Sequence, residues 1–183
     1  MTLLNETKKY VASIFEPGQI PHFERTLYWV KQLRPGVDEA IQIAAYAHDV
    51  GRASQGFKDF QQQMIIAEKT DEIAKKADIY HQEEGERMIQ AFLSKHTKDQ
   101  KFIDKVGFLV RNHEDGGTTD SDLVKDADSL SYFDTNVHKH LKMYPKNLAT
   151  KKFNYMYNRI SSKKAKSLAK PIYENAIKQL QKL

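Results

Sequence analysis

The stretch DEAIQIAAYAHDVGR, residues 38–52, decides the fold that this chain is expected to adopt. Asp38 is a residue type that favours the N-cap of a helix, and the apolar residues after it recur with the spacing of one helical face. These apolar residues are Ile41, Ala44 and Ala45. His48 follows on the same face, so the pattern predicts a helix that turns a histidine toward the core. We expect Gly51 to end this helix.

Helical periodicity continues in both directions from this stretch, and no sustained alternation of apolar and polar residues indicates a strand. The other expected helices cover about residues 4–15, 23–33, 81–95, 99–115, 121–130, 146–160 and 163–180. Asp120 or Ser121 is expected to cap the helix that starts there. The pattern is weaker over residues 54–78, where we expect one helix around Met64 and a short one at Ile73. The chain is therefore predicted to be all-α, a compact single-domain helical bundle.

The composition narrows the class of protein. The chain has 183 residues, a length typical of one domain, and no cysteine, which excludes disulfides and thiolate metal ligands. Its apolar runs are too short to cross a bilayer, and its first residues lack the pattern of a signal peptide. We therefore expect a cytoplasmic protein with no membrane partner. The pattern leaves the oligomeric state open.

The charge is divided unevenly along the chain. Residues 135–183 carry a net charge of +11, whereas residues 1–134 carry −6. The basic segment is either a solvated helical surface or a surface that attracts polyanions such as nucleotides or nucleic acid. One hypothesis is that its lysines speed the capture of an anionic substrate. The lysines chosen for this role are Lys151, Lys152, Lys163 and Lys164.

Several helices place a histidine or an aspartate where an amphipathic helix normally places an apolar side chain. His48, His81, His113 and Asp128 all share a face with apolar residues three or four positions away. A buried carboxylate is costly unless a cation or a hydrogen-bond donor partners it. A divalent metal would explain these residues together, and imidazole and carboxylate ligands suit Fe, Mn, Co, Ni or Zn, with Mg as a further choice.

The run from Ala47 to Arg52, with its adjacent His48 and Asp49, resembles the signature of the HD-domain phosphohydrolase superfamily. His22 matches the early histidine of that family. The segment 125–130, KDADSL, resembles the closing motif, in which Asp128 rather than Asp126 is the expected ligand. The resemblance spans about residues 20–135 and makes residues 136–183 a basic helical extension. It implies a metal-dependent hydrolase that cleaves a nucleotide-type phosphate ester or anhydride.

The number of metals stays open at this stage. The resemblance implies that His22, His48, Asp49 and Asp128 bind one ion. His81 and His113 lie in the interval where two-metal relatives place further ligands, as in members that cleave dinucleoside polyphosphates or cyclic dinucleotides. The Gly-Tyr-Pro motif of the cyclic-dinucleotide group is absent. Otherwise His81 and His113 would line the pocket and bind phosphate, or simply pack.

Three further residues are candidates for a role in the reaction beside Asp49. Arg52 follows the His-Asp pair and would bind phosphate, unless it only caps the helix. Arg25 lies one turn after His22, in a His-x-x-Arg arrangement that resembles nucleotide-cleaving relatives. Glu84 lies one turn after His81 and could orient a ligand or act as a base. The expected partner is a small phosphorylated molecule.

Two other functions are alternatives to a phosphohydrolase. A protein with a degenerate metal site could sense a nucleotide, and the basic segment could bind nucleic acid. The aromatic residues in that segment are expected to pack onto the bundle rather than to stack on bases. Side chains expected on exposed surfaces are those of His96, Glu114, Asp115, His138 and His140.

Overall fold

The structure is a computed structural model that describes residues 2–66 and 71–182. Within these ranges the regular secondary structure is helical and contains no strand, which confirms the all-α prediction. The α-helices are α1 Leu3–Ile14, α2 Ile20–Leu33, α3 Glu39–Ala47, α4 Gln55–Ile66, α5 Asp71–Leu93, α6 Gln100–Arg111, α7 Thr119–Thr135, α8 Val137–Met143, α9 Lys146–Asn158 and α10 Lys163–Gln181. Two short 3-10 turns are η1 Pro17–Gln19 and η2 Val50–Ala53.

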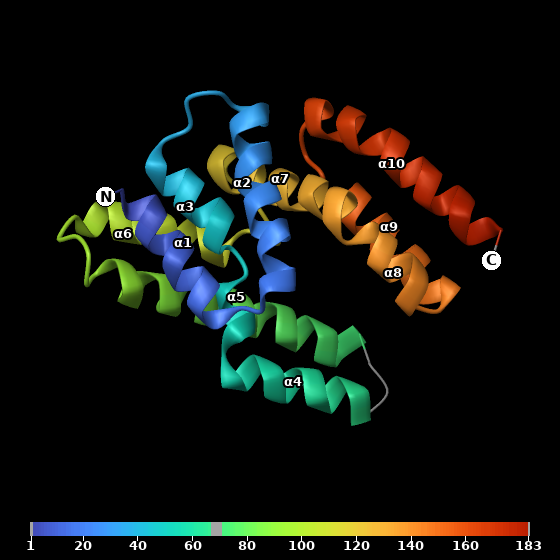
Figure 1. The fold of residues 1–183 in the computed structure, drawn as a ribbon, viewed down its shortest axis with the longest axis horizontal. Helices are drawn as coiled ribbons and strands as arrows, with labels where there is room; N and C mark the ends of the chain where they lie inside the picture. Colours follow the sequence, from blue (N-terminus) through green and yellow to red (C-terminus); the bar gives the residue numbers. More distant parts are fainter. Residues whose placement is uncertain (1, 67–70, 183) are drawn as a thin grey trace.

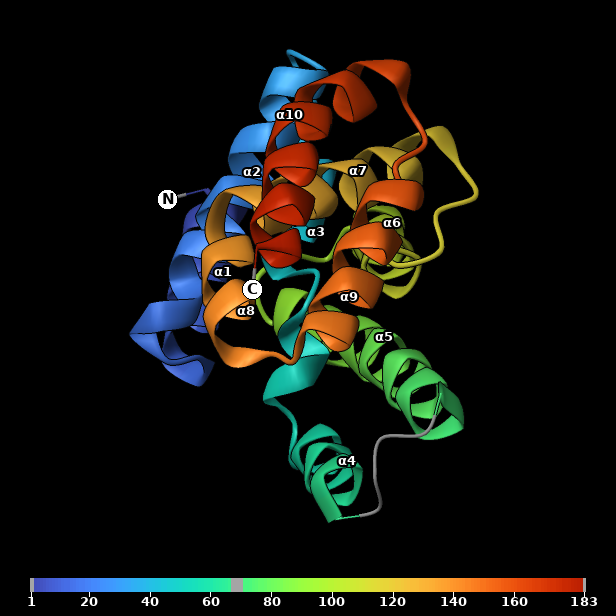
Figure 2. The same cartoon turned by 90° about the vertical axis from the view of Figure 1, so that its right-hand side faces the viewer.

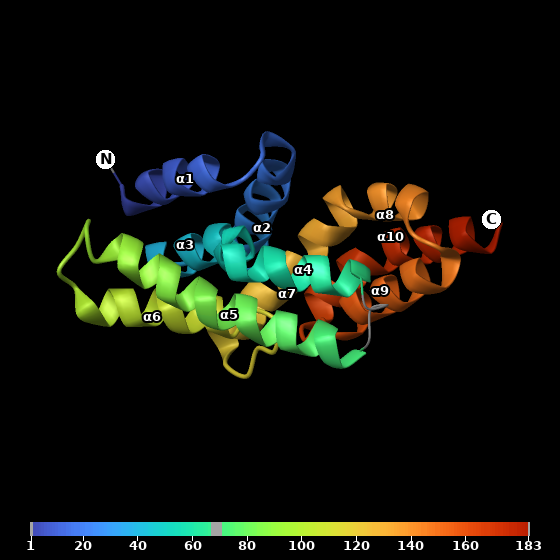
Figure 3. The same ribbon diagram turned by 90° about the horizontal axis from the view of Figure 1, so that it is seen from below.

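Helices α2 and α7 pack against each other at the centre of the molecule, and the remaining helices are arranged around them. Helix α3 packs against α2 and α6, and α6 lies beside the long helix α5 (Figures 1 and 3). Helix α4 packs along α5 and against the turn η2. Helices α8, α9 and α10 pack against α7 and against one another, and Figure 2 shows them together on the side that faces the viewer.

Two apolar clusters form the interior, and α7 contributes to both. Val124 and Ala127 on α7 belong to the cluster that α1, α2, α3, α5 and α6 complete. Leu130 and Phe133 belong to the cluster formed with α8, α9 and α10. The basic segment is therefore not a loose tail, because its apolar residues bury a core of their own against α7.

The helix ends follow the sequence signals in most places and differ in others. Asp38 accepts a hydrogen bond from the backbone N–H of Ile41 at 3.0 Å, so it caps α3 as expected. Helix α7 is capped by Thr118, not by Asp120 or Ser121, because the Thr118 hydroxyl accepts from the Ser121 N–H. The short helix expected at Ile73 is wrong, since that residue lies in the 23-residue helix α5. Helix α8 was not anticipated.

Gly51 has a different role from the expected one. Helix α3 ends four residues earlier at Ala47, and Gly51 lies in the turn η2 with no positive φ. A Cβ atom on Gly51 would lie 2.0 Å from the carbonyl oxygen of His81 and 2.7 Å from the backbone nitrogen of Gly85. Glycine is needed here because η2 and α5 approach so closely. This approach brings the residues before Gly51 next to His81.

Among the described helices, none combines the length and the apolar character that crossing a bilayer requires.

The close approach at Gly51 predicts the effect of a single methyl group. Gly51→Ala should lower the free energy of unfolding by about 1–3 kcal/mol, the usual cost of overpacking, because the contacting atoms are backbone and cannot turn away. Urea denaturation measures this value. Gly18→Ala is the matched control, because no atom lies within 4 Å of a Cβ at Gly18. Equal stability of the two variants would contradict the close approach.

Candidate metal centre

Six residues converge from five different helices or the turns that follow them. His22 lies in the first turn of α2, and His48 and Asp49 lie in the turn after α3. His81 lies within α5, His113 in the turn after α6. Asp128 lies on α7. The structure arranges them in two groups that could each hold an ion.

The first group consists of His22, His48 and Asp128. The Nε2 atom of His22 lies 3.2 Å from Nε2 of His48 and 3.0 Å from Oδ1 of Asp128. The Nε2 atom of His48 lies 3.4 Å from the same oxygen. Ligand atoms bound about 2.1 Å from one ion lie about 3.0–3.4 Å apart, so these separations fit a single metal.

The second group consists of Asp49, His81 and His113. The two imidazoles present Nε2 atoms 3.4 Å apart, and Oδ1 of Asp49 lies 3.6 Å and 3.5 Å from them. The other oxygen of Asp49, Oδ2, lies 3.6 Å from Nε2 of His48. Asp49 therefore lies between the groups and offers one oxygen to each, as a carboxylate that bridges two ions would.

Hydrogen bonds on the far side of each buried imidazole fix its orientation. Each of the three buried histidines uses Nδ1 to contact a backbone carbonyl oxygen three or four residues earlier. The contacts are His48 to Ala45 at 2.9 Å, His81 to Ala77 at 3.2 Å and His113 to Val110 at 2.7 Å. A carbonyl only accepts, so Nδ1 carries the proton. The Nε2 atoms then face one another, an arrangement that suits a metal ion, and that of His81 also lies 3.3 Å from Nη2 of Arg52.

The ring of His22 is also oriented through its Nδ1 atom, but by a side chain rather than by a backbone carbonyl group. The Ser131 hydroxyl donates to the carbonyl oxygen of His22 at 2.7 Å, so it accepts from His22 Nδ1 at 2.9 Å. The donor set of this centre therefore fits a divalent metal, with ring nitrogens and carboxylate oxygens aimed at common points and held from behind.

Asp126 and Asp128 have different surroundings. The carboxylate of Asp126 accepts hydrogen bonds from the backbone N–H groups of Ser161 and Ser162 at 2.7 Å and 2.8 Å. Those contacts anchor the turn between α9 and α10. Asp128 faces the histidines instead, which is the geometry expected for the ligand of the pair.

Arg52 lies beside the second group. Its Nε atom is 2.5 Å from Oδ1 of Asp49, and its Nη2 atom is 3.3 Å from Oε1 of Glu114. The Asp49 and Glu114 carboxylates raise the pKa of Arg52 against the opposing effect of burial, so it stays charged. The helix-capping role considered for Arg52 gives way to a role in this charge network.

Two residues of the network were not found from the sequence. Glu114 was expected to face solvent, yet it is 9 % exposed, with its carboxylate between Arg52 and Arg159. That expectation is wrong because α6 ends at Arg111 and the following turn directs Glu114 inward. Arg159 bonds to Asp128 and Glu114. The one available signal is that Arg159 is the single arginine among the eleven lysines of residues 135–183.

Arg25 and Glu84, the other two candidates, have partners elsewhere. Arg25 donates to the carboxylate of Asp134, which also accepts from the indole N–H of Trp29 at 2.7 Å. Glu84 accepts from Arg87 on the surface of α5 at 2.8 Å. Their assignment to phosphate binding and to base or orienting chemistry stays a prediction.

A cavity of about 420 Å³ opens beside the candidate metal ligands. His22, Asp49 and Arg52 form one wall. Lys139 and His140 of α8 contribute to another. His140 was expected on an exposed surface but is only partly exposed, and burial together with Lys152 lowers its pKa to about 4. Its ring is therefore neutral near physiological pH.

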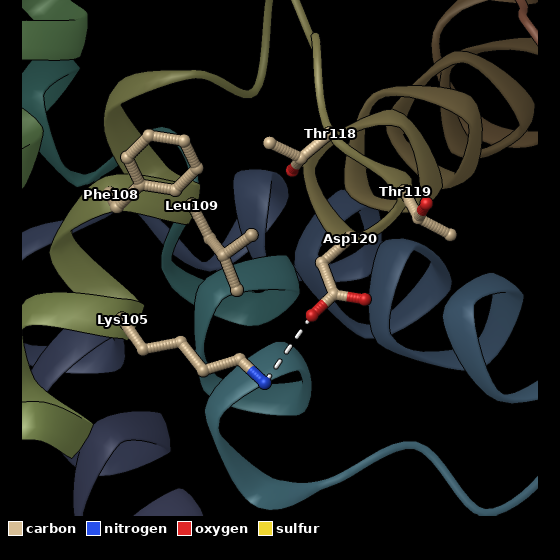
Figure 4. A pocket seen from close by; sticks show the side chains of 6 residues that line it. All are labelled: Lys105, Phe108, Leu109, Thr118, Thr119 and Asp120. Atoms are coloured by element: carbon tan, nitrogen blue, oxygen red, sulfur yellow. Dashed lines mark ion pairs between the residues drawn. The ribbon is translucent and has the colours of Figure 1, made fainter.

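A second cavity, of about 340 Å³, lies between α6 and the start of α7 (Figure 4). Lys105 and Asp120 form an ion pair across it at 3.3 Å. None of the six ligand residues lines it, so the larger cavity is the one that adjoins the candidate centre.

The lysines chosen for substrate capture are not equivalent. Lys152 contacts the rings of Tyr132 and Tyr155. Lys164 donates to the carbonyl oxygen of Gln32 at 2.7 Å and so caps the end of α2. Lys151 and Lys163 are exposed. Burial lowers the pKa of Lys152, and Glu114 and Asp128 of the centre oppose that effect.

Metal binding should release a proton from His48. Burial alone would lower the pKa of His48, but Asp49 and Asp128 overcome burial and raise it to about 9. The ring is therefore protonated near neutral pH, and a metal at Nε2 must displace that proton. Calorimetric titration with Mn²⁺ in buffers of different ionisation enthalpy should give about one proton per chain, a number that falls as the pH rises through 9. Metal binding without proton release near neutral pH would contradict this assignment.

The two groups predict the number of ions. Elemental analysis of the metal-loaded protein should give about two ions per chain, because each of the two groups offers three ligands. His113→Ala should lower the count to about one, since it removes a ligand of the second group alone. His96→Ala is the matched control, because His96 is exposed. A count of one in the wild type, unchanged by His113→Ala, would favour the alternative in which His81 and His113 only line the pocket.

Comparison with known proteins does not add to this geometry. No protein-family model, curated protein or solved structure matches the chain.

Proposed function

We propose that this protein is a metal-dependent phosphohydrolase that cleaves a small nucleotide-type phosphate ester or anhydride. The observation that carries the proposal is the position of Asp49, with one oxygen 3.5–3.6 Å from the Nε2 atoms of His81 and His113 and the other 3.6 Å from that of His48. Two metal-binding groups joined by one carboxylate suit in-line displacement at phosphorus. The resemblance of the motifs to the HD-domain superfamily supports the same reaction.

The residues around this centre would have different roles in the reaction. Divalent metals held here would supply Lewis acidity toward a phosphoryl oxygen and lower the pKa of an attacking water. His22, His48 and Asp128 hold one position, and His81 and His113 hold the other, with Asp49 between them. Rigid placement of these groups is the protein's main contribution, because phosphoryl transfer depends on positioning and charge stabilisation.

The cavity favours a small substrate. Its volume of about 420 Å³ lies within the range typical of small-molecule sites. Arg52 and Lys139 on its walls are cations that can neutralise phosphate charge. Gln19 and Asn136 offer amide groups, and Phe15 offers an aromatic ring, which suits a nucleoside. A nucleotide with its phosphate toward Arg52 and its base toward Phe15 would use these groups together.

A substrate panel tests the proposal. Protein stripped of metal should release no phosphate from nucleoside mono-, di- and triphosphates, dinucleoside polyphosphates or cyclic nucleotides. Reconstitution with Mn, Fe, Co, Ni, Zn or Mg should restore hydrolysis of at least one class. Nucleotide binding without hydrolysis under every metal would support the sensor alternative, and binding of oligonucleotides alone would support the nucleic-acid alternative.

Asp49→Asn should lower turnover by more than about 100-fold, the loss seen when one key electrostatic group of an active site is removed. The amide keeps the size of the side chain but lacks the negative charge that lies close to His48 of the first group and to His81 and His113 of the second. Helical circular dichroism should be unchanged. Asp104→Asn is the matched control, because Asp104 is an exposed residue of α6 that accepts a hydrogen bond from Gln100 and belongs to neither group. Normal turnover of Asp49→Asn in metal-supplemented buffer would remove Asp49 from the site.

A further inference from the structure

A chain of alternating charges lies outside the metal ligands and connects the two groups. It runs from Asp49 to Arg52, Glu114, Arg159 and Asp128. Its two ends are metal-ligand candidates, one from each group, whereas the three residues between them are not in the predicted ligand set. We name these five residues the outer ionic chain.

Arg159 uses all parts of its guanidinium. It lies at the C-cap of α9, and its side chain is only 7 % exposed. Its Nε atom donates to the hydroxyl of Ser129 at 2.8 Å, its Nη1 atom donates to Glu114, and its Nη2 atom donates to Oδ2 of Asp128. Each nitrogen therefore has a separate partner, an arrangement that a planar fork can satisfy and an ammonium group cannot.

The two carboxylate oxygens of Asp128 have different contacts. Oδ2 accepts from Arg159, while Oδ1 lies 3.0 Å and 3.4 Å from the Nε2 atoms of His22 and His48. Rotation of the carboxylate would break the contact with Arg159 at the same time as it moved Oδ1 from the histidines. The arginine thus holds the ligand in the orientation in which it faces the first group.

Glu114 fixes the arginine in turn. Its Oε2 atom accepts from Arg159 and from the hydroxyl of Tyr155 at 3.1 Å, and its Oε1 atom lies 3.3 Å from Nη2 of Arg52. The carboxylate is therefore held on both sides. Without it, two guanidinium groups would lie close together with less compensation of their charge.

We propose that Arg159 is a positioning residue of the metal centre, which holds Asp128 for metal binding and is itself held by Glu114. This inference rests on the proposed metal centre and adds a requirement to it. Arg159 comes from the basic segment, outside the region of residues 20–135 that carries the motifs. The segment 136–183 is then an integral part of the first metal group rather than an appendage.

Positioning and simple electrostatics predict opposite effects. A cation near a metal site repels the metal, so electrostatics alone predicts that removing the charge of Arg159 tightens metal binding. Positioning predicts weaker binding, because an unheld Asp128 must be ordered when the metal arrives. Loss of a residue that orients a metal ligand typically weakens metal affinity about 10–100-fold. The direction of the change therefore separates the two explanations.

The experiment measures Co²⁺ binding without substrate, in a His113→Ala parent that keeps the first group. Chelator competition gives the affinity, and the visible absorption of Co²⁺ reports the coordination geometry. Arg159→Gln should weaken binding about 10–100-fold and change the absorption spectrum. Arg159→Lys should also weaken it, because the ammonium group cannot span Asp128 and Glu114. Glu114→Gln should weaken it by less, since Arg159 keeps its contact with Asp128.

Arg34→Gln is the matched control. Arg34 also pairs with an aspartate of α7, Asp120 at 2.6 Å, but in the first turn of the helix, whereas Asp128 lies near its middle. The affinity of the Arg34→Gln variant for Co²⁺ should equal that of the parent. Circular dichroism should show that every variant is folded. Unchanged or tighter Co²⁺ binding in Arg159→Gln, or full recovery in Arg159→Lys, would overturn the inference. A parent that binds no Co²⁺ would overturn the metal centre itself, so the two failures are distinguishable.

Discussion

The constraint on which this structure depends is the convergence of buried imidazole Nε2 atoms with the carboxylates of Asp49 and Asp128. Three of these rings contact a backbone carbonyl oxygen through Nδ1, and these contacts keep their Nε2 atoms directed inward. Nitrogen and oxygen atoms placed this close together need protons or cations among them, and the proton of His48 and the guanidinium of Arg52 supply part of that need. The helices must therefore meet at one place, and the close approach of η2 to α5 at Gly51 is part of that requirement.

Periodicity within single helices is what made much of this arrangement predictable. His81 and Asp128 lie on apolar helical faces, so their inward direction follows from local spacing alone. His48 was also expected to face the core, although on a helix that ended at Gly51, whereas α3 ends at Ala47 and the His48–Asp49 pair lies in the turn after it. The choice of Asp128 over Asp126 came from the resemblance, and the geometry agrees with it.

What the sequence did not predict depends on contacts between distant segments. Glu114 was placed on the surface because its inward direction is set by the turn after α6 and by Arg159, which lies 45 residues later. Gly51 was taken for a helix end because its neighbours on α5 are 30 or more residues away in the chain. No local pattern carries such information, since the partner that decides each position is fixed only when the helices pack.

Trp29 is the single tryptophan of the chain, and its place in the fold gives the molecule an internal optical reporter. The ring packs against both apolar clusters, and its indole N–H donates to Asp134 on α7. Indole emission responds to the polarity around the ring and to its hydrogen bond. Fluorescence of the unlabelled protein would therefore follow the docking of α8, α9 and α10 onto the remaining helices, with no dye and no added residue.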